Sequence, residues 1–207
     1  MKASSNCLAE YASSSNPEKR LNLLERLYEV LKKFNKTDRV IIPTMATLDS
    51  LLQTNYFSSN NYNAILDKIL VEIDTHFKSQ NIFKLVQISA LTSNFVQYEN
   101  CSKKALEILL QSLYHTFPKV RKQSAERLYL QIVSGNMQNI LKNEELIERA
   151  TLILGESKWQ NRIFELIPFK DELCKCFGIE SSKIIPMKDE EDLQSVKGYE
   201  NLVKEDY

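Results

Sequence analysis

The residues that could perform acid–base or nucleophilic chemistry are few in this sequence, and their spacing does not group them. The two histidines, His76 and His115, are far apart, and neither has a neighbouring motif that supplies a nucleophile or a metal partner. Both lie where a helix is expected to end and where a cation is mildly favoured, so we interpret them as ordinary helix-end residues. The carboxylates of Glu144–Glu145 and Asp171–Glu172 are adjacent rather than facing, which leaves no general acid–base pair.

The four cysteines are Cys7, Cys101, Cys174 and Cys176, and they lack the paired spacing of a disulfide framework. Cys174 and Cys176 are two residues apart, which on a helix places them about 200° around the axis, so they cannot both face one ion. The chain does not start with a positively charged segment followed by an apolar run, as a secretory signal would. We expect a reducing, cytoplasmic environment and no metal site.

Glycine is scarce, with four residues where an average composition of about 7% predicts roughly fourteen. No two glycines are close enough to form a dinucleotide-binding loop, a P-loop or a kinase-type loop. Hairpin signals of the Asn-Gly or Asp-Gly type are also missing, which disfavours an all-β fold. We therefore assign no catalytic and no cofactor-binding residue, and we expect neither a cofactor nor an enzyme.

The formal charge is balanced, with 27 Lys plus Arg against 27 Asp plus Glu, and 43% of the 207 residues are hydrophobic. Such a composition is typical of a folded globular protein. It gives no overall electrostatic attraction to nucleic acid, which we do not expect as a partner. No stretch approaches the roughly 20 apolar residues that span a bilayer, so no membrane insertion is expected.

The elements that position these residues are amphipathic helices. Asn16 and Pro17 form a helix start, and leucines and aromatics then recur every three or four positions as far as Phe34. Pro43 predicts a helix from about Pro43 to Gln53, preceded by a kinked or extended segment. The same patterns predict the remaining helices at 62–77, 82–96, about 102–115, 118–133, 143–155 and within 157–177.

Two features refine the helix predictions. Pro168 is expected to kink or split the last helical region, and Gly178 is expected to stop it. The turn at 116–117 is so short that the helices on either side should be antiparallel neighbours. A succession of such helices without strand candidates predicts an all-α fold, an α-solenoid of antiparallel helix pairs.

The segment Phe117–Leu128 resembles the second helix of a HEAT repeat, with Pro118 opening the helix, Val120 and Leu128 facing the core, and a small Ala125. A looser echo occurs at 38–51, about 80 residues earlier, which is close to two repeats of roughly 40 to 47 residues. We therefore expect HEAT-like helix pairs.

We divide the chain into three parts. Residues 1–15 are interpreted as the end of a preceding repeat or an N-terminal extension, residues 16–179 as the HEAT-like helical domain, and residues 180–207 as an acidic, flexible tail. The tail has eight acidic and four basic residues, so the preceding part carries the compensating positive charge. The run Asp189–Asp192 is expected to be solvated, with docking as the alternative.

Two candidate partner-binding features stand out. Lys119, Arg121 and Lys122 lie in one helical turn, where they could contact an acidic partner. The alternative is that Arg121 is a structural residue paired with an acidic neighbour and that the lysines are solvated. Trp159, the single tryptophan, is either an interface anchor or a core residue of the last helix pair.

Four segments together resemble the C-terminal portion of the tubulin-folding cofactor D family, also called tubulin-specific chaperone D. They are Thr37–Phe57, His115–Tyr129, Leu154–Trp159 and Leu173–Ile179, and the resemblance covers roughly Leu8 to Pro186. Members of this family are long HEAT-repeat proteins. The resemblance implies capture of β-tubulin, and assembly or dismantling of the αβ-tubulin heterodimer together with cofactors C and E and an Arf-like small GTPase.

The resemblance also implies a cytoplasmic, microtubule-associated protein in an assembly that stimulates GTP hydrolysis by tubulin, at the partners' nucleotide sites. One alternative is a generic HEAT-repeat adaptor, such as a transport-receptor or phosphatase-scaffold fragment. The other is an all-helical hydrolase, which would need a deep pocket with clustered titratable groups.

Overall fold

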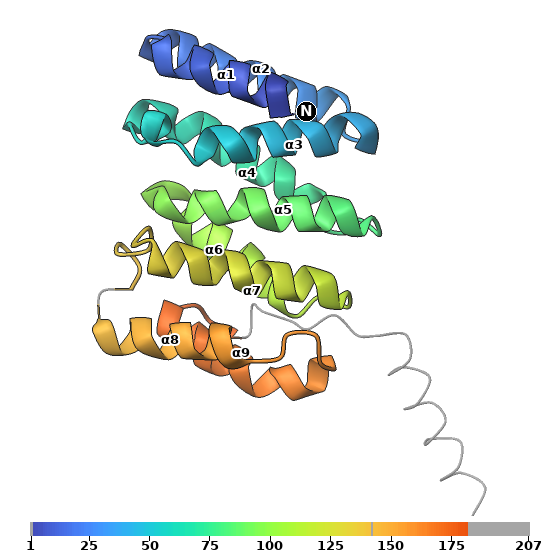
Figure 1. The fold of residues 1–207 in the computed structure, drawn as a ribbon, viewed down its shortest axis with the longest axis vertical. Helices are drawn as coiled ribbons and strands as arrows, with labels where there is room; N and C mark the ends of the chain where they lie inside the picture. Colours follow the sequence, from blue (N-terminus) through green and yellow to red (C-terminus); the bar gives the residue numbers. More distant parts are fainter. Residues whose placement is uncertain (1, 142, 182–207) are drawn as a thin grey trace, which may run out of the picture.

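The computed structural model describes residues 2–141 and 143–181, and this part of the chain is helical, without strands. The helices stack in two layers along one axis (Figure 1). The first layer contains α1, α3, α5, α7 and α8, and the second contains α2, α4, α6 and α9. The helix bounds are α1 Lys2–Ser14, α2 Pro17–Lys33, α3 Asp38–Leu52, α4 Asn63–Thr75, α5 Ile82–Asn94, α6 Glu99–Leu113, α7 Pro118–Val133, α8 Glu144–Glu156 and α9 Ile163–Phe177. The predicted all-α solenoid is confirmed.

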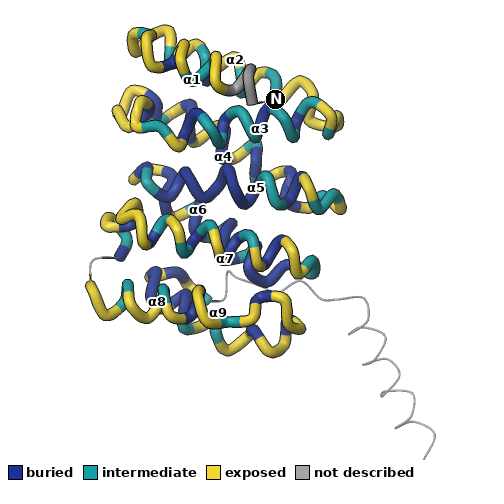
Figure 2. The backbone as a smooth tube through the Cα atoms, viewed as in Figure 1, coloured by how far each residue is buried: buried dark blue, intermediate teal, exposed yellow. Residues whose placement is uncertain are grey.

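Each helix packs mainly on its neighbours in the stack, as α3 does on α1 and α5, and α5 on α3 and α7. The predicted pair on either side of 116–117 is confirmed, since α6 and α7 are packed together. The alternation between layers ends after α7, because α8 returns in the opposite direction within the first layer before α9 enters the second (Figure 1). The buried residues lie between the layers and along α5 and α6 (Figure 2).

Side chains at equivalent positions of α3, α5 and α7 form a hydrogen-bonded row across the first layer. Asn94 Nδ2 donates to Asp49 Oδ1 at 2.7 Å, and Gln131 Nε2 donates to Asn94 Oδ1 at 3.4 Å. These partners are 45 and 37 residues apart in the chain, so the two steps together agree with the predicted interval of roughly 80 residues. The repeat is therefore present in space, with unequal steps.

The prediction of a kinked or extended segment before Pro43 is wrong, because α3 is helical from Asp38. Proline at the sixth helical position removes one backbone hydrogen bond, the one that would reach the carbonyl of Arg39. Ile41, Met45 and Leu48 are fully buried on both sides of the proline. Burial of such side chains contributes about 1.5–3 kcal/mol each, which outweighs the preference of the residue before proline for an extended conformation.

Pro168 does not split the last helix, which is continuous over its whole length. The proline occupies the sixth position of α9, as Pro43 does in α3, and its ring is exposed. The predicted stop is confirmed, since Gly178 is left-handed with φ of 65°. The segment from Ser157 to Arg162 precedes α9 as a turn around Trp159.

The helix starts expected at Asn16 and at residue 143 are also confirmed. Asn16 Oδ1 accepts a hydrogen bond from the backbone N–H of Lys19 at 2.9 Å, and Asn143 Oδ1 accepts one from Glu145 at 2.9 Å. The Asn- and Ser-rich segment before α4 contains two short 3-10 turns, Asn55–Phe57 and Asn60–Tyr62. A third, Phe95–Gln97, follows α5 and takes up the end of the helix predicted to reach residue 96.

The proposed division at residues 15 and 180 stays a prediction. Helix α1 packs on α2 and α3, and so contributes to the same stack. Asp189–Asp192 and the rest of 182–207 lie outside the described residues. Across the described helices, none combines the length and apolar character that a membrane span requires.

The row through Asn94 leads to a stability prediction. Replacing Asn94 by Ala removes the amide that joins α3 to α7, in a position where the side chain is buried. We expect Asn94→Ala to lower the free energy of unfolding by about 1–3 kcal/mol, measured by urea denaturation. The exposed Asn139 provides the control, since Asn139→Ala should change it by less than about 0.5 kcal/mol. Equal effects of both substitutions would contradict a structural role for the row.

Candidate functional site

Arg121, one of the predicted partner-binding residues, lies inside the protein with only 2% of its surface exposed. Its Nη1 donates to the carbonyls of His115 at 2.7 Å and Thr116 at 2.9 Å, in the turn before α7. Its Nε donates to the carbonyl of Trp159 at 2.8 Å, in the turn before α9. The guanidinium therefore joins two turns that are about 40 residues apart in the chain.

The same side chain makes two further contacts to the α8–α9 turn. Nη2 donates to the carbonyls of Gln160 at 3.4 Å and Asn161 at 2.5 Å. All five guanidinium N–H groups are thus directed at backbone carbonyls, which suits the planar fork of arginine and not the single ammonium of lysine. This geometry supports the structural alternative for Arg121, with carbonyl partners in addition to any charged neighbour.

Trp159 is also in the core, with 4% of its surface exposed. Its indole N–H donates to the carbonyl of Leu154 at 2.9 Å, and its ring lies 6.5 Å from that of Tyr114 and 6.4 Å from that of Phe169. The side chain closes the α8–α9 pair against the end of α6. In this conformation it is not presented to a partner, which favours the core alternative.

The two histidines do end helices, but the cation argument for them is wrong. His115 is buried between Phe77 and Phe117, and its Nδ1 accepts a hydrogen bond from the backbone N–H of Phe117 at 3.1 Å. Burial, with the nearby charge of Arg121, lowers the pKa of His115 to about 4. Burial and the charge of Lys84 also lower the pKa of His76. At neutral pH both rings are uncharged.

Lys119 and Lys122 are the two predicted contact residues that the structure leaves on the surface. Lys119 Nζ lies 5.1 Å from the centre of the Phe83 ring, across the boundary between α7 and α5. Lys122 Nζ is 3.8 Å from a Glu126 carboxylate, and both side chains are more than half exposed, so this ion pair is weak. Lys119 and Lys122 thus face solvent while Arg121, between them in sequence, faces inward.

Asp38 and Lys84 form a second polar contact at the start of the first-layer helices. Lys84 Nζ lies 2.8 Å from one Asp38 oxygen, and Asn81 Nδ2 donates to the other at 2.8 Å. These hydrogen bonds, that from Lys84 first, lower the pKa of the Asp38 carboxyl. The buried ammonium of Lys84 is therefore paired and is not part of the exposed positive surface.

No group of three or more His, Cys, Asp or Glu side chains that could hold a metal ion occurs among the described residues. Cys174 and Cys176 are buried, and burial raises the pKa of both thiols. An open groove of about 520 Å³ lies between α8 and α9, with Arg149, Glu156 and Glu172 among its charged lining residues. Arg149 and Glu172 are hydrogen-bonded to each other across it.

Comparison with known proteins relates part of this helical stack to a family. Residues 1–84 match the family model described as "Tubulin folding cofactor D C terminal". This match identifies these residues with the cofactor D family. The matched part contains α1 to α4 and the first residues of α5, and it includes the segment Thr37–Phe57. The resemblance to the C-terminal domain of cofactor D is confirmed.

The other three resembling segments lie beyond the match to the cofactor D family, in α7 to α9. No solved structure matches the chain. The contact between Phe83 and Lys119 therefore joins a residue inside the matched cofactor D part to one outside it.

Sequence reasoning missed Phe83, the most exposed large apolar side chain in the described part, at 71%. The apolar residues of 82–96 cover most of the helix circumference, a pattern that does not single out an exposed position. The available signal was its position two residues after the cap Asn81, in the first turn of the helix.

The geometry of Arg121 yields a stability prediction. We expect Arg121→Ala to lower the free energy of unfolding by about 3 kcal/mol or more, because several charge-assisted hydrogen bonds are lost. Arg121→Lys should recover less than half of this loss, since one ammonium cannot reach both turns. Lys122→Ala, at an exposed neighbouring position, should stay within about 0.5 kcal/mol of the unaltered protein in the same urea titrations. A fully stable Arg121→Ala protein would rule out the structural role.

His115 gives a prediction for pH dependence. Its pKa is about 4 when folded and about 6.5 when unfolded, so the unfolded chain binds more protons between these values. Stability should therefore be full above about pH 6.5 and fall as the pH drops toward 4, by about 3 kcal/mol for this residue. His115→Asn, which keeps an acceptor for the Phe117 N–H, should flatten the decline in melting temperature between pH 7 and pH 5. His76 contributes in the same direction, so part of the decline should remain; an unchanged slope would count against the assignment.

Proposed function

We propose that this chain is a non-enzymatic protein-binding scaffold in tubulin folding. The observation that carries the proposal is the match of residues 1–84 to the C-terminal region of cofactor D. The helical stack supports it, because α-solenoids expose extended surfaces on which other proteins bind. The finer proposal names β-tubulin as the bound subunit, with cofactors C and E and an Arf-like small GTPase as further partners.

In this proposal the chain contributes binding and not chemistry. Stimulation of GTP hydrolysis takes place in the partners' nucleotide sites, and the protein is cytoplasmic and microtubule-associated. The α8–α9 groove is a described hollow with several charged side chains that an enzyme could use. Its Arg149 and Glu172 are already joined to each other, and no nucleophile is activated there by a neighbouring base, which favours a scaffold over a hydrolase.

Binding of purified proteins tests the proposal. We expect the chain to co-elute with αβ-tubulin, or with tubulin together with cofactor E and the Arf-like GTPase, in gel filtration. An albumin of similar concentration serves as the negative control. A chain that is folded by circular dichroism but retains none of these proteins would favour the generic adaptor. Release of phosphate from GTP by the chain alone would favour an enzyme.

A further inference from the structure

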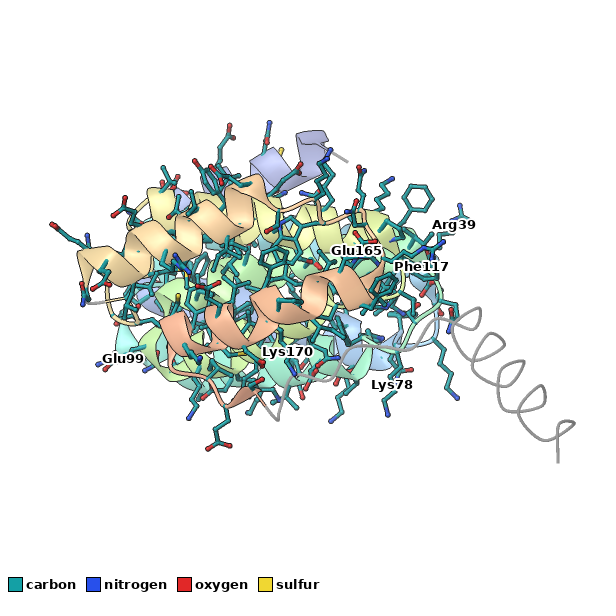
Figure 3. All side chains as sticks on the ribbon, turned by 90° about the horizontal axis from the view of Figure 1, so that it is seen from below. Arg39, Lys78, Glu99, Phe117, Glu165 and Lys170 are labelled. Atoms are coloured by element: carbon teal, nitrogen blue, oxygen red, sulfur yellow. The ribbon has the colours of Figure 1, made fainter. Side chains whose placement is uncertain are left out.

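The turns between the two layers meet at one edge of the stack, which we call the turn edge. It is formed by the turns 34–37, 76–81, 114–117 and 157–162, together with the first residues of the helices that follow. Figure 3 shows Arg39, Lys78, Phe117 and Glu165 at this end and Glu99 at the opposite end. The contacts of Lys84 with Asp38, of Lys119 with Phe83, and of Arg121 with Asn161 join each of these turns to the next.

The residue type at the second position of the helices that start at the turn edge alternates from one helix to the next. These positions are Arg39 in α3, Phe83 in α5, Lys119 in α7 and Phe164 in α9, so a cation and an aromatic side chain alternate along the edge. All four are exposed, with Phe164 at 54%. Arginine and aromatic side chains are the residue types most enriched where proteins bind one another.

Further cations surround these four positions. They are the exposed Lys36, Lys78, Lys122, Lys158 and Arg162. Within residues 2–141 and 143–181, only Lys122 among them has an ion pair, and that pair is weak.

The acidic side chains near the turn edge are largely engaged. Asp38 is held by Lys84 and Asn81, Asp74 lies 3.3 Å from Lys104, and Glu165 accepts a hydrogen bond from Asn161 at 2.7 Å. Glu156 also lies close, before the last turn. The exposed and unpaired charge of this edge is therefore mainly positive, although the whole chain is neutral.

Two of the cations are also placed against the local field. A positive charge in the first turn of a helix is unfavourable by about 0.3–1 kcal/mol, and both Arg39 and Lys119 are at the second helical position. Stability alone does not account for these residues at these positions. Contact with an opposite charge from outside the described chain would compensate for this cost.

We infer that the turn edge binds an extended, acidic polypeptide segment that also presents aromatic or apolar side chains. Stacked helices are about 10 Å apart, which an extended chain spans in about three residues. A segment with an acidic and an apolar residue alternating at every third position therefore matches Arg39, Phe83 and Lys119 in turn. This inference rests on the proposed function and specifies the kind of partner surface that the scaffold takes.

A nucleic acid fits this surface less well. Engaged carboxylates such as Asp38 and Glu165 lie among the cations, and the net charge of the chain is zero. The aromatic positions are separated by cations, so they do not form the continuous stacking platform of a single-strand binder. An oligonucleotide is therefore the competing occupant in the test.

The probe is a short fluorescein-labelled peptide in which Glu and Phe alternate at every third position, separated by serines. Its control is a peptide of the same composition with the Glu and Phe residues in two blocks. We expect the alternating peptide to bind with higher affinity in fluorescence anisotropy, and its affinity to fall as salt is raised. The opposite order of affinities, or tighter binding of an oligothymidine of equal charge, would overturn the inference.

Two sets of variants locate the binding. Lys119→Glu/Lys122→Glu and Phe83→Ser alter the turn edge, and Lys68→Glu/Lys103→Glu makes the same charge change at exposed positions within α4 and α6, away from the residues of the turn edge. We expect at least about a tenfold loss of peptide affinity for the edge variants and less than about threefold for the control. Equal losses in both sets would overturn the inference.

The stability of the variants separates lost binding from lost folding. Glu at position 119 complements the helix dipole, which offsets the lost Lys122–Glu126 ion pair and the repulsion between Glu at 122 and Glu126, so Lys119→Glu/Lys122→Glu should melt close to the unaltered protein. The same variants are then tested with αβ-tubulin. If tubulin still binds all variants equally, the inference about the turn edge is wrong and the proposed function stands. If the peptide results are as expected but tubulin is not retained by the unaltered protein, the inference about the turn edge stands and the proposed function fails.

Discussion

The contact on which the last third of the stack depends is the one between Arg121 and the carbonyls of two turns. The α8–α9 turn lacks a continuous helical hydrogen-bond pattern, so its carbonyls need donors from elsewhere. One guanidinium supplies them at Trp159, Gln160 and Asn161 while also holding His115 and Thr116. Without this contact, α8 and α9 would be joined to α7 mainly by apolar packing.

The position of Arg121 has a consequence for the surface. The inward guanidinium holds the start of α7 against the α8–α9 turn. Lys119 and Lys122, on either side of Arg121 in the sequence, point outward. Lys119 then reaches the ring of Phe83 on the neighbouring helix. An internal structural residue thus sets the spacing of the exposed residues on either side of it, and the turn edge is a property of the stack and not of any single helix.

Much of the fold follows from local sequence signals. Asn16, Asn143, Pro118 and Gly178 mark helix ends with the chemistry that helix ends require, and the structure confirms all four. The two internal prolines were misjudged. Near the start of a helix a proline removes only one backbone hydrogen bond, and buried neighbours on both sides keep the helix continuous.

The sequence by itself determined the class of the protein: amphipathic helices without strands, no phosphate-binding loop, and a resemblance to cofactor D that the match of residues 1–84 bears out. Periodicity and capping are short-range properties, which is why they can be read along the chain. Only the tertiary structure decided which of Lys119, Arg121 and Lys122 face solvent and that Trp159 is internal. It also decided that Phe83 is exposed and that Arg39 and Lys119 share one edge. These placements depend on which turns stack together, and the residues that join neighbouring turns are about 35 to 45 positions apart in the chain.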